Sequence, residues 1–357
     1  MPRKFSKKNI LYTILLIVLL IAVGYVITHK DVIFGTGSTQ PVPSEQTGPT
    51  EPTVRTAFDY TQADFADAGL RVYYLNVGQG DGILLRYKDG TDFLIDAGST
   101  TRTPSKAKAD ELMFNYLKEK VFTTDDKTIE YLIATHSDSD HINMMPYVFD
   151  NYTVGHVYYN PDNHDTVAYR NAVTAYARAS EITPIPQYGE TYVITRAELT
   201  VTIYAPGYKR FSDVNSSSPI IVVEYRETRL VFTGDAHANT EAWFLSERAK
   251  TNGATKTDVL KVGHHGSSSS SSVAFLSALS PEFAVISVGA GNTYGHPTAQ
   301  TMSRLSAIGC ATYRTDRQGN IALFVNADGR YGFLTDNQND VDNNKDNKLD
   351  FRINPTL

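Results

Sequence analysis

The chain has 357 residues, about twice the length of a typical single domain, so it can bury a full core and carry additional segments. A hydrophobic content of 41% and a charged content of 20% exclude a collagen-like, disordered or polytopic membrane protein as the main body. The net charge of -6 argues against a broad electrostatic grip on nucleic acid. The one cysteine, Cys310, can form neither an internal disulfide nor a thiolate zinc site, which leaves His and carboxylate as metal ligands.

Residues 1–30 are predicted to form a cytoplasmic basic tip followed by a transmembrane signal anchor. Four basic residues at positions 3, 4, 7 and 8 precede the uncharged, mostly apolar run 10–27. About 18 helical residues span roughly 27 Å, close to the thickness of a bilayer core. The basic flank is expected to stay in the cytosol, which sends the rest of the chain outside. The alternatives are secretion after signal cleavage, for which residues 23–26 offer a poor site, and a buried core helix.

The next segments differ sharply in composition. Residues 31–66 are predicted to be a flexible linker, because the stretch 35–53 is rich in Gly, Ser, Thr, Gln and Pro. Residues 67–335 are expected to fold as one domain. The tail 336–357 is crowded with Asp and Asn and is expected to be solvated. The spacing of its Asp and Asn residues is similar to that in a calcium-binding loop, but the tail lacks the turn glycine and the final Glu of such a loop.

Short apolar runs alternate with helical patterns along the domain. Strands are predicted from β-branched and aromatic content, and helices from apolar faces at helical spacing. Strands followed by helices indicate a layered α/β domain. The expected strands are 72–77, 82–87, 92–95, 129–134, 154–159, 198–204, 220–225, 230–232, 259–262, 284–288 and 321–325, and the expected helices are 106–118, 239–250, 271–279 and 298–308.

The strongest chemical signal follows the apolar strand ending at residue 134. His136, Asp138, Asp140 and His141 are four potential ligands within six residues. At the exit of a buried strand they can point toward one metal without a long flexible loop, and two carboxylates balance much of a dication's charge. The alternative is a polar loop in which Asp140 caps a helix.

Two further strands deliver possible ligands at their ends. Asp235 follows the strand 230–232, and the adjacent His264 and His265 follow the strand 259–262. Each signal alone is weak, since polar residues are common at strand ends. Three such clusters in one chain are hard to explain by packing and predict a metal-dependent active site.

These motifs, in this order, resemble the metallo-β-lactamase superfamily, and within it the soluble hydrolase domain of ComEC-type DNA-uptake (competence) proteins. The resemblance covers about 260 residues and does not include the pore-forming membrane segments of those proteins. The matching segments are 75–82, 94–98, 136–141, 233–235, 261–267, 292–297 and 313–316.

The resemblance implies a four-layered αββα sandwich with a metal site at one edge of two packed sheets. It implies two divalent ions, zinc or manganese. His136 and Asp138 would hold one ion, Asp140 and His264 would hold the other, with or without His141, and Asp235 would bridge them. His264 is preferred to His265 because it leaves the strand first. The neighbour would then orient the site or touch substrate.

The sequence departs from the superfamily pattern around the first metal. Most members have His where Asp138 stands, and a further His before the bridging Asp. Here that interval offers only the Asn-Ser-Ser-Ser stretch 215–218, with His156 and His164 far earlier. Carboxylate in place of imidazole shifts the expected preference from zinc toward manganese or magnesium, or weakens the site.

Supporting roles are expected for residues around the metals. The resemblance implies that Asp96 supports the site from behind the ligands, although a loop carboxylate capping residues 98 and 99 is an alternative. Asp81 is expected to organise the first turn. Lys261 and Arg314 are the best local cations for an anionic substrate, although such residues are usually just solvated. Ser267 begins a serine run that forms either a lip over the site or a simple loop.

The expected reaction is hydrolysis by a metal-activated hydroxide. Asp140 or Asp235 would relay the proton, and His296 would assist the leaving group unless its role is structural. The resemblance implies a phosphodiester substrate, with extracellular DNA as the leading candidate, and no protein partner can be inferred. The alternatives are a cell-wall phosphocholine esterase, a lactonase-type hydrolase, and a non-catalytic surface-binding module with a degraded metal site.

Overall fold

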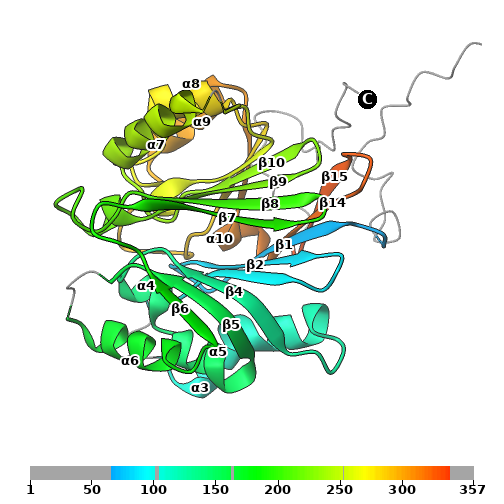
Figure 1. Cartoon of the computed structure of the whole chain (residues 1–357). Coiled ribbons are helices and arrows are strands. Elements are labelled where there is room, and N and C mark those ends of the chain that lie inside the picture. The colour runs from blue at the N-terminus through cyan, green and yellow to red at the C-terminus, as the bar shows by residue number, and fades with distance from the viewer. Residues whose placement is uncertain (1–65, 101–103, 162–164, 252, 338–357) are drawn as a thin grey trace, which may run out of the picture. The chain divides into compact units, whose positions relative to one another are not determined.

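The computed structural model describes residues 66–100, 104–161, 165–251 and 253–337 (Figure 1). The predicted signal anchor, nearly all of the linker and all but two residues of the tail lie outside these ranges. Within them, no helix has both the length and the apolar content needed to cross a membrane. The regular elements run from Leu70 to Thr335, close to the predicted domain limits of 67 and 335.

The first sheet is mixed and has eight strands in the order β15-β14-β1-β2-β3-β4-β5-β6. Strands β3 to β6 pair in parallel, and the other neighbours are antiparallel. The strands are β1 (Leu70–Tyr74), β2 (Gly82–Tyr87), β3 (Asp92–Ala97), β4 (Thr128–Ala134), β5 (Thr153–Tyr159), β6 (Glu181–Pro184), β14 (Ile321–Val325) and β15 (Tyr331–Thr335).

The second sheet is also mixed and has seven strands in the order β13-β12-β11-β10-β9-β8-β7. Strands β10 to β13 are parallel, whereas β7 to β10 form an antiparallel meander. The strands are β7 (Glu190–Arg196), β8 (Leu199–Ala205), β9 (Ile220–Tyr225), β10 (Thr228–Phe232), β11 (Val259–Lys261), β12 (Phe283–Ile286) and β13 (Ala311–Arg314).

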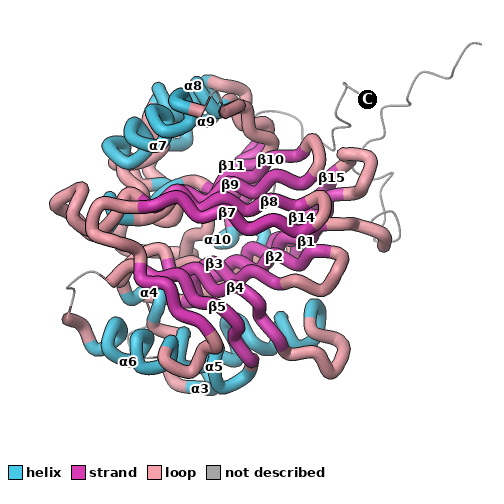
Figure 2. Tube along the Cα trace, in the orientation of Figure 1, coloured by secondary structure: helices cyan, strands magenta, loops and turns pink. Residues whose placement is uncertain are grey.

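The two sheets pack face to face, and helices cover the outer face of each (Figures 1 and 2). On the first sheet lie α3 (Lys106–Ala109), which continues through π-helical turns at Asp110–Phe114 and Leu117–Val121, and α4 (Ser139–Ile142), α5 (Met145–Asn151) and α6 (Val167–Tyr176). On the second lie α7 (Ala238–Lys250), α8 (Val273–Leu279) and α9 (Ala299–Ala307). Short turns of helix occur at Asn215–Ser217, Gly263–Gly266 and α10 (Thr315–Gln318).

The four layers follow from strands that are apolar on both faces. In β1, Val72 and Tyr74 point into the core between the sheets, whereas Tyr73 points into the core under the helices. This is the two-residue alternation of a strand. Tyr74 stacks on Phe232 of the opposite sheet with ring centroids 6.1 Å apart. A third core lies between the second sheet and its own helices. The layered α/β arrangement expected from the sequence is therefore present.

Apart from the ten-residue helix α6, the elements that the sequence did not predict are short or lie at sheet edges. Strand β7 forms one edge of the second sheet and exposes 62% of Val193, so its apolar pattern is weak. Strand β6 has four residues and forms an edge of the first sheet. Strands β13 and β15 and helices α4, α5, α6 and α10 were also not predicted. Their apolar residues become recognisable only against the sheets that they complete.

A buried ion pair links the two sheets next to the strand ends. Lys261 ends β11 in the second sheet, and its Nζ lies 2.9 Å from Oδ2 of Asp81, which precedes β2 in the first sheet. The two side chains are 0% and 1% exposed. The Asp81 N–H also donates to the Asp140 carbonyl at 3.0 Å. Lys261 was expected to offer a cation to substrate; the structure instead places it inside, where it compensates the Asp81 carboxylate.

Replacing Lys261 with Met should therefore destabilise the domain strongly. An uncompensated buried carboxylate costs about 3–5 kcal/mol, whereas an exposed pair contributes about 0–1 kcal/mol. Urea unfolding of metal-free protein measures the difference, with Lys106→Met as the control because Lys106 pairs with Asp110 on an exposed helix surface. The double variant Lys261→Met/Asp81→Leu should recover most of the loss. Equal free energies of unfolding for Lys261→Met and Lys106→Met would contradict this interpretation.

Candidate metal centre

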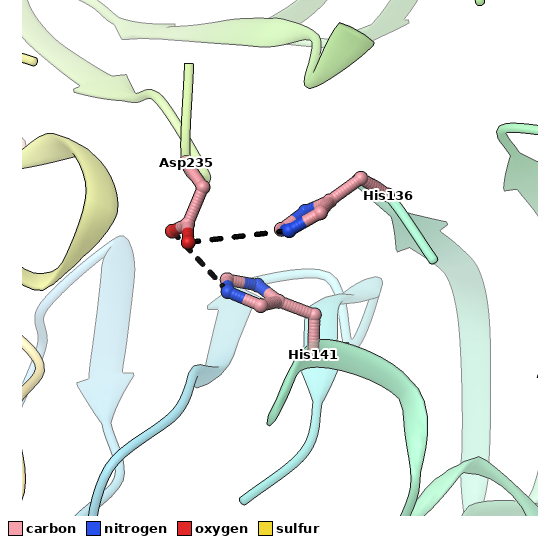
Figure 3. Close-up of side chains that lie close together, drawn as sticks. All are labelled: His136, His141 and Asp235. Atoms are coloured by element: carbon pink, nitrogen blue, oxygen red, sulfur yellow. Dashed lines mark ion pairs between the residues drawn. The ribbon is translucent and has the colours of Figure 1, made fainter. Parts of the chain in front are cut away.

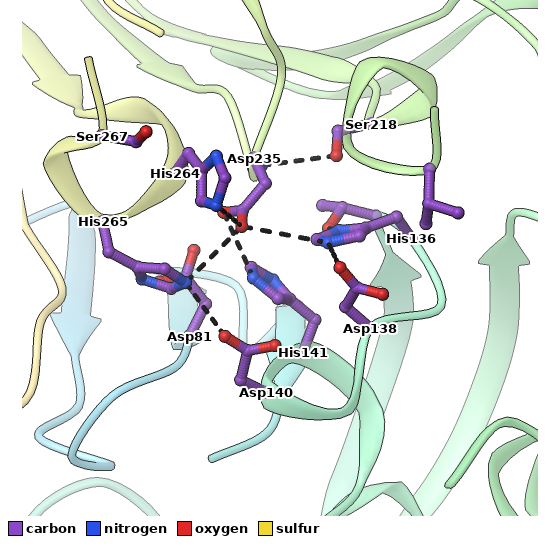
Figure 4. Close-up of polar contacts among 12 residues, drawn as sticks. Asp81, His136, Asp138, Asp140, His141, Ser218, Asp235, His264, His265 and Ser267 are labelled. Atoms are coloured by element: carbon purple, nitrogen blue, oxygen red, sulfur yellow. Dashed lines mark hydrogen bonds and ion pairs between the residues drawn. The ribbon is translucent and has the colours of Figure 1, made fainter. Parts of the chain in front are cut away.

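The three predicted clusters meet at one edge of the two sheets (Figure 4). Strand β4 ends just before His136, β10 just before Asp235, and β11 just before the two adjacent histidines. The parallel strands of each sheet bring their carboxyl ends to the same edge, so segments about 100 residues apart in sequence become neighbours. Asp138 is the N-cap residue of α4, which then carries Asp140 and His141. The alternative in which Asp140 caps this helix is therefore wrong.

The Asp235 carboxylate lies at the centre of the cluster (Figure 3). Its Oδ1 is 3.2 Å from Nε2 of His141. Its Oδ2 is 3.9 Å from Nε2 of His136 and 3.6 Å from Nε2 of both His264 and His265. One buried carboxylate is thus surrounded by four imidazoles.

The inward-facing atoms have the properties of metal ligands. The Nε2 atoms of His136, His141 and His265 and the Oδ1 atom of Asp235 are buried and have no hydrogen-bond partner. Buried polar atoms are nearly always paired, so several unpaired ones around one point indicate a missing partner. The ligand atoms of three sets lie within 4.8 Å of one another: His136, His141 and Asp235; Asp140, His141 and His265; and Asp81, Asp96 and His141. Imidazole and carboxylate are ligands that fit zinc and manganese alike.

Two of the histidines are held in place from behind. The Nδ1 atom of His141 lies 2.7 Å from Oδ2 of Asp96. Asp96 also accepts hydrogen bonds from the Thr135 backbone N–H at 2.8 Å and from its hydroxyl at 2.7 Å. The Nδ1 atom of His265 lies 2.9 Å from the Ser287 carbonyl. These bonds fix which nitrogen faces the cluster. The Ser99 backbone N–H donates to the Asn143 side chain and not to Asp96. The alternative in which the Asp96 carboxylate caps the loop at Ser99 is therefore not supported.

Gly98 allows this support to come close. A Cβ atom at Gly98 would lie 2.3 Å from the Asp140 carbonyl carbon and from the His141 nitrogen. Any side chain would push α4 away from the loop that follows β3. The absence of a side chain at Gly98 therefore lets Asp96 reach His141.

The charges in the cluster stabilise one another. Burial alone would raise the pKa of Asp140, but the ion pair with His265 and the nearby His141 lower it to about 2. Burial opposes ionisation of Asp235 as well, yet His141 and His265 hold its pKa well below its usual range. Burial would lower the pKa of His141, but Asp235 and Asp96 raise it well above its usual value. Both carboxylates are therefore ionised at neutral pH, and a cation that binds there displaces the His141 proton.

Of the two adjacent histidines, His265 is the one that joins the second ligand set. Both have positive φ angles, 50° and 51°, in the turn after β11. This turn buries His265 and brings its Nε2 to 3.3 Å from Oδ2 of Asp140. His264 stays 23% exposed, and its Nδ1 lies 3.2 Å from Nε2 of His237. The sequence analysis expected His264 in this set. The turn after β11 instead directs His265, the second histidine after the strand, toward Asp140.

His237 is a neighbour that sequence reasoning missed. It caps α7, stacks on the His264 ring at 5.3 Å and places its Nδ1 3.2 Å from Oδ1 of Asp213. Burial lowers the pKa of His264 to about 4, so its imidazole is neutral at pH 7. The available signal was its position two residues after Asp235, directly before a predicted helix.

The side of the cluster around His136 is rich in oxygen. Oδ2 of Asp138 lies 3.6 Å from Nε2 of His136, and the side chain is 34% exposed. The Ser218 hydroxyl accepts from the Asp235 backbone N–H at 3.3 Å and faces the site where a further imidazole was sought (Figure 4). His156 bonds to Thr183 on β6 at 2.7 Å, away from the cluster. His164 lies outside the described residues.

The remaining predicted residues differ in their distance from the cluster. The His296 ring packs edge-to-face on His264 at 5.4 Å, and its loop fits closely because a Cβ atom at Gly266 would lie 2.5 Å from Pro297. Ser267 bonds through its hydroxyl to Ser269 at 3.0 Å and stands apart from Asp235 (Figure 4). Arg314 makes two hydrogen bonds to Asp316, at 3.0 and 2.6 Å. The structure therefore brings His296 to the site and engages Arg314 in an ion pair.

Three curated relatives are similar in sequence. Recombination protein 2 of Haemophilus influenzae is 31% identical over 258 residues, covering 70% of this chain and 28% of the relative. ComE operon protein 3 of Bacillus subtilis is 29% identical over 254 residues, which cover 69% of this chain and 32% of the relative. Competence protein ComA of Neisseria gonorrhoeae is 36% identical over 124 residues, covering 35% and 18%. The chain thus spans about a third or less of the length of each relative.

Two solved structures are similar at lower levels. The metallo-β-lactamase fold protein YhfI of Bacillus subtilis is 12% identical, with a TM-score of 0.43 over 69% of this chain and 96% of that one. CmlA, a diiron β-hydroxylase from Streptomyces venezuelae, is 12% identical, with a TM-score of 0.46 over 72% of this chain and 54% of CmlA. The sequence comparison is decisive: residues 75–290 match the model of the metallo-β-lactamase superfamily. The chain therefore belongs to the metallo-β-lactamase superfamily and is related to competence proteins of the ComEC, Rec2 and ComA type.

Proposed function

We propose that the domain is a metal-dependent hydrolase that cleaves phosphodiesters and holds two divalent cations on the two sides of Asp235. The observation that carries the proposal is the set of buried, unpaired ligand atoms facing one another around this carboxylate. His136 and Asp138 would hold one cation. Asp140, His141 and His265 would hold the other.

The bound cations would supply the charge that makes water nucleophilic near neutral pH and that balances the developing charge of the phosphodiester. The chain's own residues prepare this environment. Asp235 is ionised between the two ligand groups, and Asp96 and the Ser287 carbonyl fix His141 and His265. Asp140, with a pKa of about 2, is ionised and suited to accept a proton. Burial lowers the pKa of His296, which suits a neutral hydrogen-bond donor to the leaving group.

The choice of phosphodiester rests on the relatives and on the resemblance to DNA-uptake proteins. The printed names of the relatives refer to recombination and competence. Nucleic acid, and extracellular DNA in particular, is therefore the proposed substrate. The geometry offers no feature that favours a phosphocholine ester or a lactone. The unpaired inward-facing imidazoles argue against a binding module with a degraded site, because such a module would gain by pairing or losing them.

The metal-bridging role of Asp235 can be tested by substitution. Asp235→Ala should lower the content of bound metal and reduce turnover of bis(p-nitrophenyl) phosphate by at least ~100-fold. Two cations close together repel unless an anion lies between them, and even residues that merely orient ligands typically account for 10–100-fold. Elemental analysis and steady-state kinetics measure the two effects. Asp165→Ala, on an exposed side chain, is the control. Full metal content with unchanged turnover in Asp235→Ala would exclude the two-metal proposal.

The oxygen-rich environment of His136 leads to a prediction about metal choice. Manganese should support the activity of metal-stripped protein at least as well as zinc, because Asp138 is a hard ligand. Asp138→His should shift the preference toward zinc, since imidazole is a softer ligand. Titration of each stripped protein with each metal measures the preference. The same zinc preference in both proteins would rule out this account of Asp138.

We further propose that the domain is anchored at the cell membrane by residues 1–30 and stands outside the cell on its linker. The support is the sequence pattern of basic residues before an apolar stretch. Protease added to intact protoplasts should remove the domain while a cytosolic marker survives. Survival of both would show that the orientation is reversed, and release of the intact domain into the medium without protease would indicate cleavage of the signal.

A further inference from the structure

A groove of about 790 Å³ opens between the loops that follow β1 and β12. One wall is the loop after β1, with Gly78 and Gln79, and the other is the loop after β12, with Gly289 and Tyr294. Both walls connect to the site. Gly289 lies two residues after Ser287, whose carbonyl holds His265, and its N–H donates to the Gln79 side chain at 3.0 Å. The loops that form the groove are therefore tied to the residues that position His265.

Tyr294 projects from the groove wall and is connected to the site by stacked rings. It is 61% exposed, and its ring lies parallel to that of His296 at 5.9 Å with an interplanar angle of 26°. The His296 ring in turn packs on His264, whose Nε2 is 3.6 Å from Asp235. Successive ring contacts thus connect Tyr294 through His296 to His264, which lies beside the central carboxylate.

The loop that carries Tyr294 is already ordered. The Asn292 side-chain amide donates to the carbonyls of Gly289 at 3.0 Å and His296 at 2.6 Å. Its carbonyl oxygen accepts from the His296 N–H at 3.0 Å. These three bonds close the loop below Tyr294. A ring held this way loses little conformational entropy when it binds a ligand.

The few cations and the exposed ring of the groove bear on which form of nucleic acid it would hold. Among the described residues that line it, the one cation is Lys108, whose Nζ lies 2.6 Å from Glu111. A duplex is gripped mainly through its phosphates by several basic side chains, and the groove does not supply them. An exposed aromatic ring offers a stacking surface to an unpaired base of any kind, whereas the bases of a duplex are already stacked on one another.

We infer that Tyr294 is a stacking platform for an unpaired nucleobase beside the scissile phosphodiester, so that the groove receives a single strand rather than a duplex. This inference rests on the proposed phosphodiesterase function. It makes Tyr294 a substrate-binding residue that acts on affinity more than on the chemical step. An aromatic ring on the substrate, not only its phosphate, then contributes to recognition.

The test uses the full-length chain in detergent with manganese and two substrates that share one backbone. The first is a single-stranded oligothymidylate, and the second is an oligomer of the same length built of abasic phosphodiester units. Tyr294→Ala should raise KM for the oligothymidylate roughly tenfold, with kcat within about threefold, because one stacked base contributes about that much. KM for the abasic oligomer should not change. Tyr294→Phe should behave as wild type, since the ring and not the hydroxyl stacks.

Controls separate this inference from the proposal beneath it. Tyr188→Ala removes a ring that is 69% exposed and does not line the groove, so it should leave both substrates unaffected. The duplex of the same oligomer should show a higher KM that is insensitive to Tyr294→Ala. Equal effects of Tyr294→Ala on both single-stranded substrates, or none on either, would overturn the stacking role while phosphodiester cleavage stands. Failure of wild type to cleave any of the substrates would instead overturn the proposed function.

Discussion

One buried carboxylate organises the candidate site. Asp235 comes from the second sheet, and the imidazoles around it come from both sheets, so its charge holds together segments that no continuous element connects. Without a cation, the nearby histidines compensate that charge, and the pKa shifts of Asp235 and His141 in opposite directions express the same attraction. A divalent cation would replace the protons in this arrangement without requiring the strands to move.

The residues around the cluster show how the fold holds the ligand side chains in position. Asp96 reaches His141 because Gly98 lets α4 approach the loop after β3. Asp81 and Lys261 tie the two sheets together directly under the strand ends. Asp96 and Asp81 contact His141 and His265 from behind and so help to fix the positions of these two imidazoles. The site is therefore as rigid as the sandwich that carries it.

The two sides of Asp235 differ in chemistry. The side with Asp140, His141 and His265 is enclosed and supplies two imidazoles. The side with His136 is more open, and Asp138 and the Ser218 hydroxyl occupy the places where nitrogen ligands were sought. This difference in burial and ligand type would affect which metal each side prefers and how fast a bound metal exchanges with solution, because an exposed carboxylate releases a metal more readily than a buried imidazole.

The sequence by itself determined which segments carry the chemistry and in what kind of fold. Strand-end patterns placed the clusters at residues 136–141, 235 and 264–265, because an apolar run followed at once by polar ligands is a local feature. The central strands of each sheet were predictable from their own apolar runs, whereas the four edge strands β6, β7, β13 and β15 were not, since their burial depends on neighbouring strands. Only the tertiary structure decided which side chains face one another. It buried Lys261 against Asp81, turned His265 and not His264 toward Asp140, and added His237. Those outcomes depend on backbone turns with positive φ and on contacts between sheets, which are properties of the assembled layers and not of any short segment of sequence.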